Sequence, residues 1–86
     1  MPYINENYRK LVDPMLTPLI PYLKERTNDG IVAYVITRII DGVYGQDFES
    51  YAKAMGVLEC IQFEYYRKRV AVFEGEKCLA HGEVFL

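Results

Sequence analysis

The most apolar stretch of the chain covers residues 51–66, with the sequence YAKAMGVLECIQFEYY. From residue 54 on, its members that are neither apolar nor glycine are Glu59, Gln62 and Glu64. A helix that is apolar on nearly all sides belongs inside a core or between subunits. The stretch is too short and too interrupted by charge to cross a membrane. We therefore expect the rest of the chain to pack around a helix over residues 47–74, or as far as residue 80.

A first helix is predicted over residues 5–26, where apolar side chains recur three and four positions apart. Its apolar stripe consists of Tyr8, Leu11, Val12, Met15, Leu16, Leu19, Ile20 and Leu23. Pro14, Pro18 and Pro21 oppose this prediction, because each removes a backbone hydrogen bond, at about 3 kcal/mol in an ideal helix interior. All three lie beside the apolar stripe and not within it. We predict a kinked helix with outward prolines, and a broken helix is the alternative.

The second segment, residues 31–44, reads IVAYVITRIIDGVY and follows a turn cluster at residues 27–30. Its β-branched residues favour a strand. Its length favours a buried helix, since strands are usually shorter. At the other end of the chain, His81-Gly82 is expected to end the third helix, and residues 83–86 to form a short extended tail. The predicted fold is all-α, a single small domain of three main helices over residues 1–86.

The composition adds an expectation about assembly. Of the 86 residues, 51% are hydrophobic and eight are tyrosine, which is more apolar surface than so short a chain can hide in a core. Aromatic side chains are typical of subunit interfaces. We expect a homodimer built along the third helix, with Tyr65, Tyr66 and Phe73 as interface candidates. An unidentified protein partner is the alternative. The net charge of −2 predicts neither nucleic-acid nor membrane binding.

Cys60 and Cys78 do not form a disulfide framework. If both lie on one helix they are about 27 Å apart, whereas a bridge requires Cα atoms within about 7 Å. Cys60 is expected to be a small buried core residue, which fits a reducing compartment. Because the N-terminus also lacks an apolar signal core, we expect a cytosolic protein. His81 has no metal-ligand partner at a suitable spacing, so neither a metal nor a cofactor is expected.

Four polar residues in apolar surroundings are the candidates for a buried polar site: Arg38, Glu59, Gln62 and Glu64. Glu59 and Glu64 lie about 140° apart on a helix, so they do not hold one metal together. We expect Glu64 to pair with Lys68 at i+4, and Arg38 to neutralise Glu59 or Asp41. The alternative is that Arg38 grips a phosphate or carboxylate group of a ligand.

The basic patch Arg67-Lys68-Arg69 follows two tyrosines and combines charge with aromatic rings, as nucleic-acid surfaces do. Three charges in one turn are more often a solvated face, and the overall charge is negative. We therefore expect the patch to face water. Weak nucleic-acid binding is kept as an alternative.

The segments YVITRII (34–40), GVLECIQFEYYRKRV (56–70), FEGEK and HGEVF resemble a family of short uncharacterised proteins that recurs in microbial and phage genomes. Members typically begin with MPYI, carry an NYVITR-like stretch, then GVLEC followed by EFYRR, and close on an NGDV-like tail. The chain departs from this pattern at Ala33, at Val72-Phe73 and at residues 81–83. The resemblance covers nearly the whole length. It implies a compact, mainly helical domain and no established activity.

No motif commits the chain to a reaction, so we do not expect an enzyme. The favoured hypothesis is a homo-oligomeric interaction protein, an adaptor or regulator that the resemblance associates with phages. The alternative is a protein that binds or hydrolyses a phosphorylated small molecule, using Arg38 with Glu59 and Glu64. Its support is that ionisable groups in apolar surroundings often mark functional sites.

Overall fold

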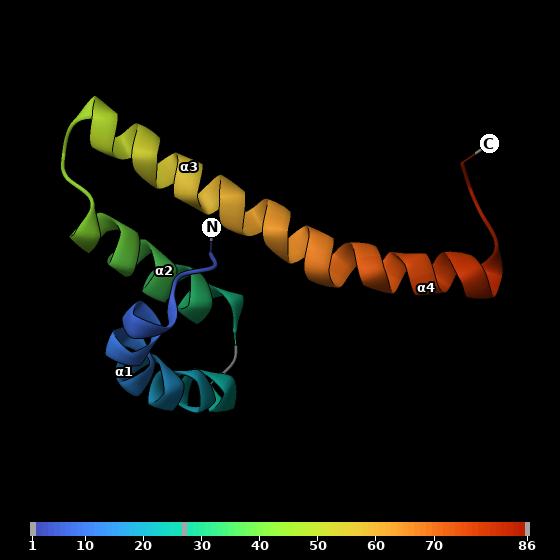
Figure 1. Ribbon diagram of the computed structural model, residues 1–86, viewed down its shortest axis with the longest axis horizontal. Helices are drawn as coiled ribbons and strands as arrows, with labels where there is room; N and C mark the ends of the chain where they lie inside the picture. Colours follow the sequence, from blue (N-terminus) through green and yellow to red (C-terminus); the bar gives the residue numbers. More distant parts are fainter. Residues whose placement is uncertain (1, 27, 86) are drawn as a thin grey trace. The chain divides into compact units, whose positions relative to one another are not determined.

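The computed structural model describes residues 2–26 and 28–85, and every regular element within them is helical. The elements are α1 (Glu6–Glu25), α2 (Asp29–Val43), α3 (Phe48–Tyr65), the π-helix η1 (Tyr66–Val70) and α4 (Ala71–His81). The all-α prediction with three main helices is confirmed, since α3, η1 and α4 follow one another without a loop (Figure 1). Residues 3–54 form one compact unit and residues 55–85 belong to a second.

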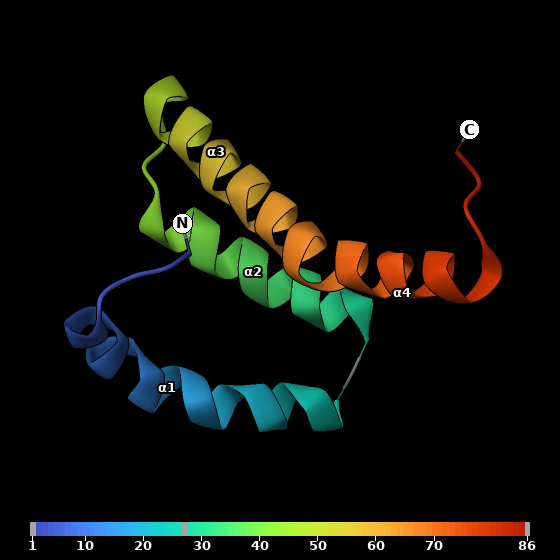
Figure 2. The same ribbon diagram turned by 45° about the vertical axis from the view of Figure 1, so that its right-hand side comes forward.

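Helix α1 runs through all three prolines as one helix of 20 residues. The prolines are exposed and recur at spacings of four and three, so their rings lie on one face of the helix. Water can then reach the carbonyl groups that the prolines leave without a donor. The helix bends, as both ribbon views show (Figures 1 and 2). The predicted kinked helix is confirmed, and the broken helix is excluded.

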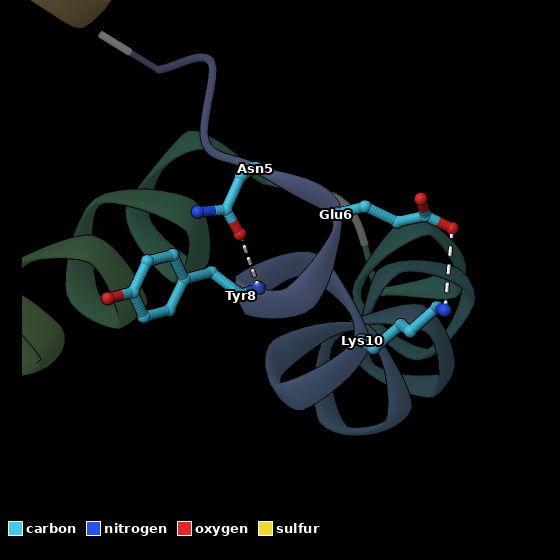
Figure 3. A network of polar contacts seen from close by, with 4 residues as sticks. All are labelled: Asn5, Glu6, Tyr8 and Lys10. Carbon is cyan, nitrogen blue, oxygen red and sulfur yellow. Dashed lines mark hydrogen bonds and ion pairs between the residues drawn. The ribbon is translucent and has the colours of Figure 1, made fainter.

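Side-chain caps mark both ends of α1. The Asn5 side chain accepts a hydrogen bond from the backbone N–H of Tyr8 at 3.2 Å, and Glu6 pairs with Lys10 at 3.4 Å in the first turn (Figure 3). At the other end, the Arg26 guanidinium donates to the Tyr22 carbonyl at 3.0 Å and lies 3.7 Å from the centroid of the Tyr22 ring. These contacts satisfy backbone groups that have no partner within the helix.

Helix α2 begins after Asn28, whose side chain accepts a hydrogen bond from the Ile31 N–H at 2.8 Å. It ends where the Tyr44 N–H donates to the Ile40 carbonyl at 3.1 Å. The prediction of a helix over residues 31–44 is confirmed, because length and a good cap outweigh the β-branched side chains here. The turn cluster before it includes Thr27, which lies outside the described residues.

Helix α3 begins directly after Asp47, the first residue of the predicted range 47–74. The Asp47 carboxylate accepts a hydrogen bond from the Ser50 N–H at 2.8 Å, which is the geometry of an N-cap. The helical run ends at His81, as predicted, because Gly82 has a φ of 99° that residues with a side chain rarely adopt. Residues 83–85 form a non-helical tail, and Leu86 lies outside the described part of the chain.

Little of the described chain is buried. Ala54 is the buried residue among the described ones, with 7% of its surface exposed. In the unit of residues 3–54, the apolar and aromatic side chains that become half-buried are Leu19, Leu23, Ile31, Val35, Ile40 and Tyr44. The expectation that residues 31–44 are mostly buried is therefore wrong for the single chain. The prediction that Cys60 is a buried core residue is also wrong, since Cys60 is exposed.

Candidate functional site

Arg38 contacts an aromatic residue one turn earlier on α2. Its Nη1 donates a hydrogen bond to the Tyr34 hydroxyl at 2.9 Å, and its guanidinium carbon lies 5.8 Å from the centroid of the Tyr34 ring. Both side chains are exposed. Within the described residues of the unit 3–54, no ion pair joins Arg38 to Asp41, which leaves Glu59 of the two predicted partners. Glu59 belongs to the other unit, and its pairing with Arg38 stays a prediction.

The predicted polar residues of α3 differ in exposure. Glu59 and Gln62 are exposed, whereas the Glu64 side chain is only 21% exposed. A Glu64 carboxylate oxygen lies 2.7 Å from Arg67 Nη2. The two charges form a close ion pair without hydrogen-bond geometry. The predicted Glu64–Lys68 ion pair is therefore wrong, and Glu64 pairs with Arg67 instead. Residues at i+3 and i+4 are both neighbours on a helix, so either basic residue could have been the partner.

The basic patch Arg67-Lys68-Arg69 lies in η1 and is exposed to water, as expected. Lys68 and Arg69 have no hydrogen bond or ion pair with any other described residue. The interface candidates Tyr65, Tyr66 and Phe73 are also exposed, by 64%, 56% and 54%. Large exposed aromatic residues beside unpaired cations suit a contact with another molecule more than a catalytic centre.

The sequence predictions missed a polar cluster at the end of α4. The Cys78 thiol donates a hydrogen bond to Glu83 Oε2 at 3.2 Å. Glu83 Oε1 accepts from the Val84 N–H at 2.9 Å and from the Phe85 N–H at 2.8 Å. The Glu83 carboxylate thus organises the first residues after the helix. The sequence signal is an acid directly after a helix-ending glycine, where a side-chain oxygen can accept from the next N–H groups.

These hydrogen bonds move two pKa values in opposite directions. The backbone N–H of Phe85, the Cys78 thiol and the backbone N–H of Val84 lower the pKa of Glu83 from its ordinary value of 4.5. The hydrogen bond to Glu83, with a smaller effect of burial, raises the pKa of Cys78 from its ordinary value of 9.0. Cys78 is therefore held as a thiol and is a poor nucleophile in this arrangement.

Two hollows lie within the separate units. The first, of about 460 Å³, is lined by Glu74, Gly75, Lys77, Cys78, His81, Gly82, Glu83, Val84 and Phe85. The second, of about 170 Å³, lies where α2 passes into α3 and is lined by Thr37, Ile40, Asp41, Tyr44, Gly45, Gln46, Tyr51 and Ala54. Neither is lined by Arg38, Glu59 or Glu64. Arg38 belongs to the unit of residues 3–54, whereas Glu59 and Glu64 belong to the other unit, so the phosphate-binding arrangement stays a prediction.

The sequence predictions also missed the second hollow, because its lining comes from two helices and the connection between them. In the structure, the Tyr51 hydroxyl donates a hydrogen bond to Gln46 Oε1 at 3.1 Å across this connection. Over residues 2–26 and 28–85, no three His, Cys, Asp or Glu side chains are arranged to hold a metal ion. Over the same residues, no helix has the length and apolar character needed to span a membrane.

A protein-family model matches the chain. The family model described as "Domain of unknown function (DUF6899)" matches residues 1–84, which is nearly the whole chain. No curated protein and no solved structure matches the chain.

Proposed function

The chain belongs to the DUF6899 family, and we propose that it is a small homodimeric interaction protein, an adaptor or regulator, whose two copies pair along the helical run of α3, η1 and α4. The proposal assigns no reaction to the chain. Its two cysteines are free, which fits the reducing cytosol in which we place it.

The observation that supports this proposal most strongly is the exposure of residues 55–85. No described residue of this range is buried, although it holds many large apolar side chains. The exposed ones are Met55, Ile61, Phe63, Tyr65, Tyr66, Val72, Phe73, Leu79, Val84 and Phe85. A helix draws most of its stability from packing an apolar face on another element. A second copy of the same helix supplies such a face, with one patch used twice.

The charges along the run favour an antiparallel pair. Glu59 and Glu64 precede its middle, and the basic patch Arg67-Lys68-Arg69 follows it. A parallel pair in register would place each cluster beside its own copy, which is destabilising. An antiparallel pair with its two-fold axis between Tyr65 and Tyr66 places the acids of one copy near the basic patch of the other. It also places the two tyrosines of each copy at the centre.

The mass in solution tests the proposal. Light scattering after size exclusion should give twice the mass of one chain for the wild type, and a smaller mass for Tyr66→Glu, because a charge at the centre of the apolar contact is costly to bury. Tyr3→Glu is the matched control. Tyr3 is similarly exposed but precedes α1, so this variant should remain dimeric. A one-chain mass for the wild type that does not change on concentration would exclude the homodimer.

Spin labels test the orientation. In the proposed antiparallel pair, Cys60 lies level with residue 71 of the second copy, so the two Cys60 labels are about 16 Å apart along the axis. Cys78 lies level with residue 53, so the two Cys78 labels are about 37 Å apart. A parallel pair in register gives similar short distances at both positions, about 8–10 Å between the helix axes. Labelling one cysteine at a time, with the other changed to serine, separates the two arrangements.

A further inference from the structure

The hollow between α2 and α3 has the chemistry of a site for a cation. Its lining holds one charged group, the Asp41 carboxylate, and no basic side chain. Within the described residues, Asp41 makes no hydrogen bond or ion pair. We propose that this hollow binds a guanidinium or alkylammonium group, and that Asp41 supplies the counter-charge.

The aromatic side chains support an organic cation over a metal ion. Tyr44 and Tyr51 line the hollow, and the face of a tyrosine ring attracts a cation within about 6 Å of its centroid. A hard metal ion needs several oxygen ligands, whereas this lining offers a single carboxylate. An anion is disfavoured because the only charge is negative. A flat, weakly hydrated guanidinium stacks on aromatic rings and pairs with a carboxylate at the same time.

Local hydrogen bonds keep the hollow in shape. The Tyr51 hydroxyl donates to Gln46 Oε1 at 3.1 Å, which links the first turns of α3 to the connection before it. The Tyr44 N–H donates to the Ile40 carbonyl at 3.1 Å and closes the end of α2. The buried Ala54 and the half-buried Ile40 give the lining an apolar part. An alkyl chain attached to the cation would contact this part.

The volume limits the ligand. A hollow of about 170 Å³ corresponds to a few water molecules, at about 30 Å³ each. It therefore admits a guanidinium or ammonium group with a short alkyl chain, and any larger part of the ligand would lie outside it. The same chemical group comes from two sources, a free small cation or an arginine side chain within a polypeptide. The probes below separate them.

The test is an NMR titration of the full-length 15N-labelled protein with ethylguanidinium. Binding is measured from the chemical shifts of the backbone amides of Asp41, Tyr44, Gly45 and Gln46. We expect saturable shifts at these amides. Asp41→Asn should weaken binding about 1.5-fold to fivefold, the range of an exposed ion pair. Asp29→Asn is the matched control: it removes the same charge from the first turn of α2, outside the hollow, and should bind like the wild type. Ethylurea, a neutral molecule of the same shape, should bind more weakly than ethylguanidinium.

The source of the cation is tested with N-acetyl-arginine methylamide, which mimics arginine within a chain. Shifts at the same amides assign the hollow to an arginine side chain of a polypeptide. Their absence, with ethylguanidinium still binding, assigns it to a free small cation. The proposal is overturned if ethylguanidinium gives no saturable shift, if ethylurea binds the wild type equally well, or if the two aspartate variants bind alike. The ethylurea comparison uses the wild type and does not depend on the folding of a variant.

Discussion

At the scale of single residues, three helices begin in the same way. Asn5, Asn28 and Asp47 each accept a hydrogen bond from the backbone N–H three positions later, at 3.2, 2.8 and 2.8 Å. Each cap satisfies a donor that the helix itself leaves unpaired. Because the described units have little buried core, such local contacts contribute a larger share of their stability than in an ordinary domain.

Loss of the Asp47 cap should therefore be measurable. Asp47→Ala is expected to lower the free energy of unfolding by about 1 kcal/mol, because the N-terminal turn of α3 loses its acceptor. Asp47→Asn should stay near the wild type, since asparagine caps about equally well. Urea unfolding followed by circular dichroism checks both. Equal stability of all three proteins would show that the cap does not hold α3 in solution.

The hydrogen bonds of Glu83 that order the tail after α4 should be strongest between an acidic and an alkaline pH limit. The pKa of Glu83 is lowered in the folded chain, so its carboxylate stabilises the turn above pH 4.5 and this contribution is lost as pH falls through the lowered pKa. The pKa of Cys78 is raised, so its contribution is present below pH 9.0 and is lost as pH rises through the raised pKa. The hydrogen-exchange protection factor of the Phe85 amide should be largest between these limits. An exchange protection factor that is constant from acid to alkaline pH contradicts this.

The thiol of Cys78 offers a second measurement of the same contact. In a Cys60→Ser background at pH 8, Glu83→Gln should speed alkylation of Cys78 by iodoacetamide about twofold to fivefold, because the thiolate is the nucleophile and the glutamate disfavours it. Glu76→Gln is the control, since it removes an equal charge from α4 but has no contact with Cys78 among the described residues. Similar rates for the two variants would argue against the Cys78–Glu83 hydrogen bond.

At the scale of the elements, three glycines inside helices have open space beside them. A Cβ added at Gly42, Gly56 or Gly75 would meet no atom of the chain within 4 Å. Glycine costs a helix interior about 1 kcal/mol relative to alanine. In the proposed antiparallel pair, Gly56 of one copy lies level with Gly75 of the other along the helix axis, because each is nine residues from its nearer axis tyrosine.

The proposed pair predicts that a glycine-to-alanine substitution stabilises the protein in α2 but weakens dimerisation in α3 or α4. Gly42→Ala in α2 should stabilise the protein by about 0.5–1 kcal/mol through helix propensity alone. Gly56→Ala and Gly75→Ala should instead weaken dimerisation, because the added methyl groups separate two closely packed helices. Sedimentation equilibrium gives the dissociation constants. If all three variants are stabilised and associate like the wild type, the two helices do not cross at these glycines.

At the scale of the whole molecule, neither described unit holds a core that would stabilise a separate chain. Folding and association should then be coupled, and the melting temperature should rise with protein concentration. We expect a clear rise over about a hundredfold range of concentration for the wild type. Tyr66→Glu should melt at a lower temperature. A wild-type melting temperature that does not change over this range would contradict coupled folding.

The helices themselves were predictable from the sequence, because periodicity, caps and helix-ending glycines act over a few residues. The caps at Asn28 and Asp47 and the stop at Gly82 are signals of this kind. The burial of Cys60 and the partner of Glu64 were predicted wrongly, and the hollow at Asp41 was not predicted. Each of these depends on which surfaces and side chains come together in space. An apolar segment indicates that a surface needs a partner, but only the tertiary structure shows that the described chain leaves most of that surface uncovered.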